Sequence, residues 1–153
     1  MFVAAVYVGR LTVTVRKARD AAEVLAARDL RIRVFCDEQG VDPSLEVDGR
    51  DEEATQVVAL DESGIIATCR LRYPDPGACK LERMVVDARQ RKLGVGGMLL
   101  DWAEEEARAN GAKTMVLNSQ LRAQAFYGSH GYEPEGETFM DADIEHIRMT
   151  KAL

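Results

Sequence analysis

The chain joins a strand-like run to a long helical run through the stretch Arg91-Lys92-Leu93-Gly94-Val95-Gly96-Gly97. The run before it, residues 81–86 (LERMVV), has the length and apolar character of a buried strand. The run after it, residues 98–110, repeats apolar residues at the spacing of one helical face. A glycine-rich turn at a helix start offers free backbone N–H groups and the positive end of the helix dipole. We therefore predict that this basic turn binds a phosphate group.

Two well-known glycine-rich loops do not fit this turn. A P-loop needs a lysine followed by Ser or Thr directly after its last glycine, and no such pair follows these glycines. A dinucleotide fingerprint, G-x-G-x-x-G, needs a third glycine where Leu99 stands. Residues 91–96 instead read R-x-x-G-x-G. Taken alone, this pattern suits either pyrophosphate binding or an ordinary strand-to-helix turn with solvated basic residues.

Further patterns follow in order along the chain, and together they resemble one enzyme family. R-x-x-G-x-G is similar to the pyrophosphate-binding signature of the GCN5-related N-acetyltransferases (GNAT), which hold acetyl-coenzyme A with it. Asn118-Ser119-Gln120, followed by residues 125–132 (AFYGSHGY), resembles a later motif of this family. Residues 33–39 (RVFCDEQ) and 144–149 (IEHIRM) resemble V-F-x-x-E-Q and I-P-H-x-x-M, motifs of a bacterial branch related to ElaA and YjcF. Glu145 stands where proline is usual. The resemblance covers roughly residues 12 to 151.

This resemblance implies the GNAT fold of the α/β (α+β) class, with a mixed sheet of about six to seven strands and about four helices. The chain of 153 residues suits a single acetyltransferase domain over residues 1–153, with residues 1–10 as an early strand or an extension. Hydrophobic periodicity predicts helices over 21–35, 98–110 and 120–129, and a loop over 37–53. It predicts strands over 11–15, 55–60, 65–73, 80–86, 113–117, 132–139 and 145–150.

Composition excludes several other classes of protein. The net charge of −6 argues against binding nucleic acid, and no apolar run approaches the ~20 residues that span a membrane. Cys36, Cys69 and Cys79 cannot all pair within one chain, so they suit a reducing cytoplasm. Cys36 and Cys69 lie in apolar-looking elements and are expected to be buried thiols. With two histidines and no Cys/His cluster, no metal site is expected.

The resemblance implies direct transfer of an acetyl group from the coenzyme A thioester to a primary amine of a small molecule or peptide. Tyr127 matches the family's general acid, since a phenol remains protonated at neutral pH and can donate to the departing thiolate. A core tyrosine with its hydroxyl near the surface is the alternative. The expected cofactor-binding residues are Met84, Val85, Val86, Arg91, Lys92, Leu93, Gly94, Val95, Gly96, Gly97, Asn118, Phe126 and Tyr127.

Glu82 is the candidate general base. The period-two rule places it with Lys80 and Met84 on one face of the strand, which faces the substrate cleft in this family. Two alternatives remain open. Glu82 can be the structural partner of a nearby arginine, or ordered water can deprotonate the amine.

The acceptor is not determined by the sequence. Residues 37–53 hold eight acids and a single base, Arg50, so this loop either attracts a cationic amine or is simply solvated. Arg70 and Arg72 share a strand face, which favours the opposite reading, that they bind a carboxylate or phosphate of the acceptor. The expected acceptor-binding residues are Arg33, Glu38, Gln39, Arg70, Arg72 and His146.

Two rival functions use the same features. The chain can be a non-catalytic coenzyme A-binding sensor or interaction module, or a nucleotide-binding protein that uses the turn at residues 91–97. An edge strand near the C-terminus can also pair between two chains, which makes a homodimer an open possibility.

Overall fold

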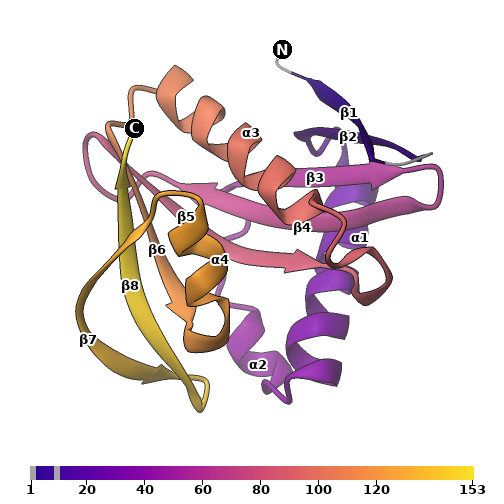
Figure 1. The fold of residues 1–153 in the computed structure, drawn as a ribbon. Coiled ribbons are helices and arrows are strands. Elements are labelled where there is room, and N and C mark those ends of the chain that lie inside the picture. The colour runs from indigo at the N-terminus through magenta and orange to yellow at the C-terminus, as the bar shows by residue number, and fades with distance from the viewer. Residues whose placement is uncertain (1–2, 9–10) are drawn as a thin grey trace.

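The computed structural model describes residues 3–8 and 11–153, and its centre is one eight-stranded sheet (Figure 1). The strands lie in the order β1-β2-β3-β4-β5-β6-β8-β7. All neighbouring strands are antiparallel except β5 and β6, which are parallel. Their bounds are β1 Ala4–Val8, β2 Leu11–Lys17, β3 Thr55–Asp61, β4 Gly64–Arg72, β5 Ala78–Val86, β6 Thr114–Gln120, β7 Glu133–Asp141 and β8 Ile144–Ala152.

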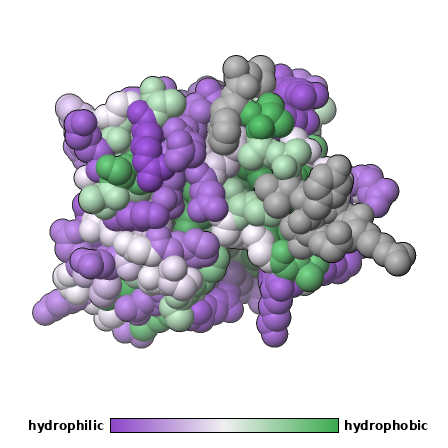
Figure 2. Space-filling view, turned by 45° about the horizontal axis from the view of Figure 1, so that its top comes forward, coloured by the Kyte–Doolittle hydropathy of each residue, from purple (hydrophilic) through white to green (hydrophobic). Residues whose placement is uncertain are grey.

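Four α-helices accompany the sheet, together with three shorter helical turns. The α-helices are α1 Ala21–Arg31, α2 Pro43–Glu46, α3 Val95–Ala109 and α4 Gln124–Ser129. The turns are a π-helical segment, η1 Ile32–Glu38, and two 3₁₀ turns, η2 Ala88–Gln90 and η3 Leu121–Ala123. The predicted mixed α/β fold is thus confirmed, with eight strands where about six to seven were expected. The face shown in Figure 2 is mostly hydrophilic, with small apolar patches between the polar side chains.

The two faces of the sheet are covered by different helices. Leu99 and Trp102 of α3 lie in the main core together with Leu71 of β4. Leu30 of α1 and Val85 of β5 belong to a second, smaller cluster. Successive strand residues point to opposite faces, so β4 gives apolar residues to the α3 side and polar residues to the α1 side.

The first predicted helix is shorter than expected and the predicted loop after it is partly helical. Asp20 caps α1 by accepting a 2.9 Å hydrogen bond from the Glu23 N–H. The α-helix ends at Arg31, however, and the chain continues in wider π-helical turns. Inside the predicted loop, Asp42 caps the four-residue α2, which is too short to produce a hydrophobic period.

The sheet opens between β5 and β6. The two strands pair only from Ala78 with Thr114 to Leu81 with Leu117. Beyond that point β5 and β6 no longer pair with each other. Residues 82–86 pair with β4 alone, and residues 118–120 pair with β8 alone. Free N–H and C=O groups therefore border a wedge between two neighbouring strands.

A β-bulge in β5 contributes to this opening. Arg70 pairs with Glu82 and Thr68 with Val85, so two residues of β5 oppose one residue of β4. Arg83, inside the bulge, has a φ of 54°, which is unusual for a residue with a side chain. The bulge alters the alternation of side chains at this point, so Arg83 joins the residues that line the wedge.

Candidate active site

A single cavity of about 960 Å³ fills the wedge between β5 and β6. Its wall includes residues of η1, β4, β5, the start of α3, β6, α4 and β8. Most residues predicted from the sequence are among them. Of the predicted cofactor-binding and acceptor-binding residues, only Leu93 and Arg33 do not line this cavity.

The glycine-rich turn forms one end of this cavity. Gly94 begins α3 with a φ of 84°, a left-handed conformation that suits glycine. A Cβ on Gly96 would lie 3.3 Å from the Phe126 ring, and one on Gly97 would lie 3.0 Å from the His130 ring. The side chains of Phe126 in α4 and of His130, which follows α4, thus pack directly against the helix start, which explains the glycines at these two positions. The first turn of α3 also lines the cavity, where its backbone N–H groups can meet a ligand.

Arg91 connects the turn to two other elements. Its Nε donates to the Val86 carbonyl at 3.0 Å, and its Nη2 donates to the Glu38 carboxylate at 2.8 Å. Glu38 was predicted to bind the acceptor, but it lies beside the turn that was predicted to bind phosphate. Lys92 also lines the cavity, whereas Leu93 is exposed outside it.

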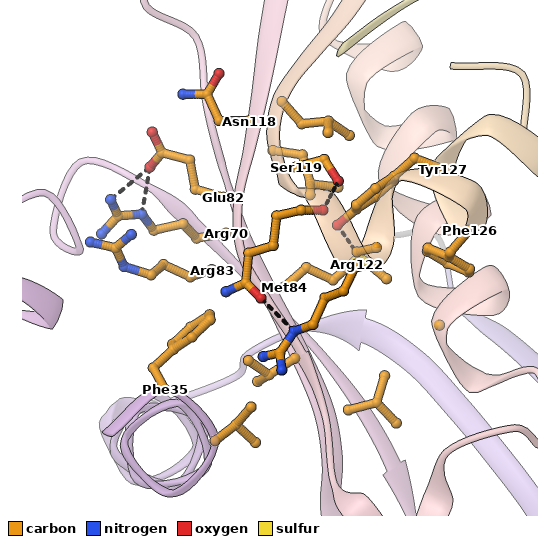
Figure 3. A pocket seen from close by; sticks show the side chains of 18 of the residues that line it. Phe35, Arg70, Glu82, Arg83, Met84, Asn118, Ser119, Arg122, Phe126 and Tyr127 are labelled. Atoms are coloured by element: carbon orange, nitrogen blue, oxygen red, sulfur yellow. Dashed lines mark hydrogen bonds and ion pairs between the residues drawn. The ribbon is translucent and has the colours of Figure 1, made fainter. Parts of the chain in front are cut away.

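Tyr127 lies on α4 with 8% of its surface exposed. Its Oη donates to the Met84 Sδ at 3.5 Å, next to the bulge of β5 (Figure 3). Edge contacts with Phe126 and Tyr132, at ring-centroid distances of 5.1 Å and 5.8 Å, hold the phenol ring in place. Burial raises the pKa of Tyr127, so the phenol keeps its proton at neutral pH.

Glu82 lies in the cavity wall, but two arginines hold its carboxylate. Arg70 donates to it at 2.7 Å through Nε, and Arg72 donates at 2.6 Å through Nη2. Burial alone would raise the pKa of Glu82, but the hydrogen bonds from Arg72 and Arg70 outweigh it and lower the pKa to about 2. A carboxylate with so low a pKa is a weak proton acceptor for an ammonium group.

The acidic loop directs several of its carboxylates into the protein. Glu46 accepts from Arg31 at 2.5 Å, and Asp51 accepts from Arg31 at 2.8 Å. Asp48 and Asp51 also pair with Arg70, which is 1% exposed. These three acids neutralise buried arginines on the α1 side of the sheet, so their charge is largely balanced within the protein.

The predicted acceptor residues fall into two groups. Gln39, Arg70, Arg72 and His146 line the cavity. Arg33 does not, because its side chain is 54% exposed and lies 3.7 Å from Asp87. The helix carrying Arg33 becomes π-helical at this point, and the wider turns shift side chains away from the spacing expected for an α-helix.

A chain of polar side chains links η1 to β6 along the cavity wall. Gln120 donates from Nε2 to the Gln39 Oε1 at 2.8 Å and accepts from the Arg122 Nε at 2.9 Å. Sequence reasoning did not assign a role to Gln120 or Arg122. Their only signal was the place of Gln120 in the Asn118-Ser119-Gln120 motif, which follows the strand predicted over 113–117, at an edge where a sheet presents polar residues to a ligand.

His146 of β8 lies opposite Gln120 of β6 in the sheet. Its Nδ1 is 2.7 Å from the carbonyl oxygen of Ile144, which can only accept, so Nδ1 carries the proton. In the neutral ring Nε2 is then an acceptor. The ring stacks on Phe139 with a centroid distance of 5.9 Å, which limits its rotation.

Cysteine and metal chemistry have little support in this site. Cys69 is a buried free thiol, as expected, and so is Cys79, whereas Cys36 is only partly buried, contrary to expectation. Burial raises the pKa of Cys69 and Cys79, to about 11 for Cys79. Within residues 3–8 and 11–153, no group of His, Cys, Asp and Glu has the arrangement of a metal site. No helix in the same part of the chain is long and apolar enough to cross a membrane.

Comparison with known proteins identifies the family. Residues 18–153 match the family model described as an acetyltransferase (GNAT) domain. The uncharacterised N-acetyltransferase YjcF of Bacillus subtilis is 36% identical over 135 residues, which cover 88% of this chain and 96% of YjcF. An acyl-CoA N-acyltransferase from Pseudomonas aeruginosa is 30% identical, with a TM-score of 0.80 over 93% of this chain and 99% of that one.

The same fold is found in Escherichia coli ElaA, with a TM-score of 0.79 at 23% identity, over 92% of this chain and 99% of ElaA. The resemblance to this bacterial branch, first indicated by short motifs, therefore extends over nearly the whole chain. From its family match, its relatives and its fold, the chain belongs to the GNAT acetyltransferases, a family of N-acetyltransferases.

Proposed function

We propose that this protein transfers the acetyl group of acetyl-coenzyme A to a primary amine of a small molecule or peptide. The observation that carries the proposal is the single cavity, which extends from the helix start at Gly94 along the free edge of β5 to Tyr127. A GNAT family acetyltransferase from Elizabethkingia anophelis has acetyl-CoA bound. It shares this fold, with a TM-score of 0.73 at 18% identity.

The residues present fit this donor. The backbone groups of residues 82–85 that face away from β4 have no partner in β6 and can hydrogen-bond the peptide-like pantetheine arm as a neighbouring strand would. The first turn of α3, with Lys92 beside it, can hold the pyrophosphate. A backbone N–H at the bulge near Met84 can polarise the thioester carbonyl, as oxyanion donors do. Phe126 and Asn118 complete the proposed binding surface.

Tyr127 is the proposed general acid. The amine attacks the thioester carbon, the bond from carbon to sulfur breaks, and the Tyr127 hydroxyl gives its proton to the departing sulfur. The phenol is buried and already donates to a sulfur atom, Met84 Sδ. Its raised pKa keeps it protonated until the thiolate forms.

Two routes are open for the amine proton. Glu82 was the sequence-based candidate, but its ion pairs with Arg70 and Arg72 make it a weak base. His146 is the better candidate within the cavity, because its hydrogen bond to Ile144 leaves Nε2 as the acceptor. Ordered water in front of either residue can relay the proton.

Calorimetry and an assay of thiol release test this function. We expect coenzyme A to bind and ATP alone to bind much more weakly, and we expect thiol release from acetyl-coenzyme A to depend on an added amine. Coenzyme A binding with no thiol release across a broad amine panel would favour the non-catalytic sensor or interaction module. ATP binding without coenzyme A binding would reject the acetyl donor.

The family does not determine the acceptor. A relative in Salmonella typhimurium, 35% identical over 77 residues, is an aminoalkylphosphonate N-acetyltransferase. That match covers 48% of this chain and 44% of the relative. A protein of the same fold at 19% identity is an aminoglycoside 6'-N-acetyltransferase. One name describes an amine with an anionic group and the other a polycation, so the acceptor must be argued from this chain's own cavity.

A further inference from the structure

We propose that the acceptor is a small amine that also carries a carboxylate or phosphonate, and that Arg83 and Lys80 bind this anionic group. This inference rests on the proposed acetyl transfer and specifies which amines the cavity admits. Both residues belong to β5 and line the cavity. Arg83 precedes Met84, whose sulfur accepts the hydrogen bond from Tyr127, so the proposed anion site adjoins the proposed reaction centre.

The charges around this end of the cavity do not balance. A connected set of ion pairs on the α1 side of the sheet joins seven cationic and five acidic residues, which leaves two positive charges in excess. Its members are Arg28, Arg31, Arg50, Arg70, Arg72, Lys80, Arg83, Glu46, Asp48, Asp51, Glu53 and Glu82. This local excess is opposite in sign to the whole chain, which has a net charge of −6.

Arg70 and Arg72 do not supply the free positive charge. Arg70 is 1% exposed, and its three nitrogen atoms contact Asp48, Asp51 and Glu82. Arg72 binds both oxygens of Glu82, at 3.0 Å through Nε and at 2.6 Å through Nη2. The sequence-based prediction that these two arginines bind the acceptor is therefore replaced by the proposal that Arg83 and Lys80 bind it.

Arg83 is bound much less tightly. Its Nη2 lies 3.4 Å from Asp48 and makes contacts of 3.4 Å and 3.5 Å with two backbone carbonyls. Its Nε is buried at 3.7 Å from Glu46 and has no hydrogen-bond partner among residues 3–8 and 11–153. The side chain is 25% exposed. Figure 3 shows Arg83 beside Arg70 on one side of the cavity, with Phe126 and Tyr127 on the other.

Lys80 supplies the second available charge. Within the described part of the chain its ammonium group makes one ion pair, at 3.4 Å from Glu82, and Glu82 is already shared by Arg70 and Arg72. An incoming carboxylate or phosphonate would give Arg83 and Lys80 the short contacts that Asp48 and Glu82 do not provide. Its negative charge would also offset the excess positive charge of the surrounding set.

Matched acceptors test the inference directly. We expect kcat/KM to be at least about tenfold higher for β-alanine and 2-aminoethylphosphonate than for ethanolamine or 1,3-diaminopropane, because the two neutral or cationic amines lack the charged contact. Comparing β-alanine with 2-aminoethylphosphonate shows whether the site prefers a carboxylate or a phosphonate. A preference for ethanolamine or the diamine would overturn the inference.

Substitution locates the anion site. Arg83→Met keeps most of the side-chain length and removes the charge, so we expect it to lower kcat/KM for the two anionic amines at least about tenfold more than it lowers kcat/KM for ethanolamine. Arg89→Met is the control, since the Arg89 side chain is 83% exposed and does not line the cavity. Lys80→Met gives an independent second variant if Arg83→Met fails to fold. Equal losses for all amines would contradict an anion site.

Direct binding separates this inference from the proposed function. If coenzyme A binds and no amine is acetylated, acetyl transfer fails. Titration of 2-aminoethylphosphonate and β-alanine into the coenzyme A-loaded protein then still tests the anion site. If coenzyme A does not bind, the same titrations use the free protein. Binding that Arg83→Met weakens supports the site, and no binding to the wild-type protein refutes it.

Discussion

Arg70 shows how a residue expected at a ligand site can be used by the protein itself. Its side chain is almost completely buried and contacts carboxylates from the acidic loop and from β5. Its sequence position indicated the correct strand face, but no local pattern shows that Asp48 and Asp51 fold back onto it. The strand face on which Arg70 lies could be predicted from the sequence. Its ion-pair partners could not, because they depend on contacts between segments that are distant in the chain.

Replacing Arg70 tests this buried ion set. Arg70→Met leaves Asp48, Asp51 and Glu82 without their shared partner, so we expect the free energy of unfolding to fall by roughly 3–5 kcal/mol. Urea denaturation measures the change. Arg89→Met, an exposed arginine outside the set, should be nearly neutral. A loss for Arg70→Met below about 1 kcal/mol would mean that the carboxylates are solvated instead of buried.

Tyr127 makes a second prediction at this scale. Tyr127→Phe removes the proposed proton donor but keeps the ring contacts with Phe126 and Tyr132. We expect kcat to fall by about 10²–10⁴-fold, with the affinity for coenzyme A nearly unchanged. Steady-state thiol release and calorimetry measure these two quantities. A parallel loss of affinity and rate would show that Tyr127 acts mainly in packing.

At the scale of elements, α3 has a glycine with a positive φ at each end. Gly94 begins the helix and Gly111 follows it, both with a φ of 84° and with open space where a Cβ would lie. Because the backbone conformation is the same, alanine should cause similar strain at either end. Only the first position belongs to the cavity wall.

This symmetry provides a matched pair of variants. We expect Gly94→Ala and Gly111→Ala each to lower the free energy of unfolding by about 1–2 kcal/mol. Gly94→Ala should also weaken coenzyme A binding, since relief of the strain moves the amides at the helix start. Thermal unfolding and calorimetry with coenzyme A measure both effects. Weakened binding in Gly111→Ala would indicate a general effect of stability.

The elements also show where sequence reasoning ends. The strand over 80–86 was predicted from its length and apolar character, and the helix after residue 97 from the helical spacing of its apolar residues. The bulge at Arg83 was not, because it depends on how β5 pairs with β4 across the sheet. The alternation rule therefore placed Glu82 toward the cavity but overlooked Arg83, the neighbour proposed to bind the acceptor.

At the scale of the whole molecule, the order of motifs was enough to predict the family and the fold. Each motif marks one wall of the cavity, and all but two of the predicted binding residues line it. Charge was harder to interpret. The acidic loop has a high local charge in the sequence, but its effect depends on distant arginines such as Arg70 and Arg83, whose hydrogen bonds to Asp48 span 22 and 35 residues. The acceptor was left open for this reason.

The ion set also predicts how stability depends on pH. The arginines lower the pKa of Asp51 and Glu82 to about 2 against the opposing effect of burial, and they lower that of Asp48. Because these folded-state pKa values lie below the unfolded ones, the ion pairs stabilise the protein above about pH 4.5. This stabilisation should be lost as the pH falls toward 2, and Arg70→Met should show a shallower loss. Urea unfolding of the wild-type protein and of Arg70→Met at several pH values tests this prediction. If the free energy of unfolding fell equally steeply with pH in both proteins, the prediction would be contradicted.

The short pairing of β5 with β6 has a mechanical consequence. Four residue pairs form the seam of the sheet between its first five strands and its last three. A molecule bound in the wedge would contact both β5 and β6 and would hold the two parts of the sheet together. Amide protons of residues 114–117 should therefore exchange with solvent more slowly when coenzyme A is added, while those of β2 and β3 keep their rates. The donor would then fasten together the two halves of the protein that it needs for catalysis.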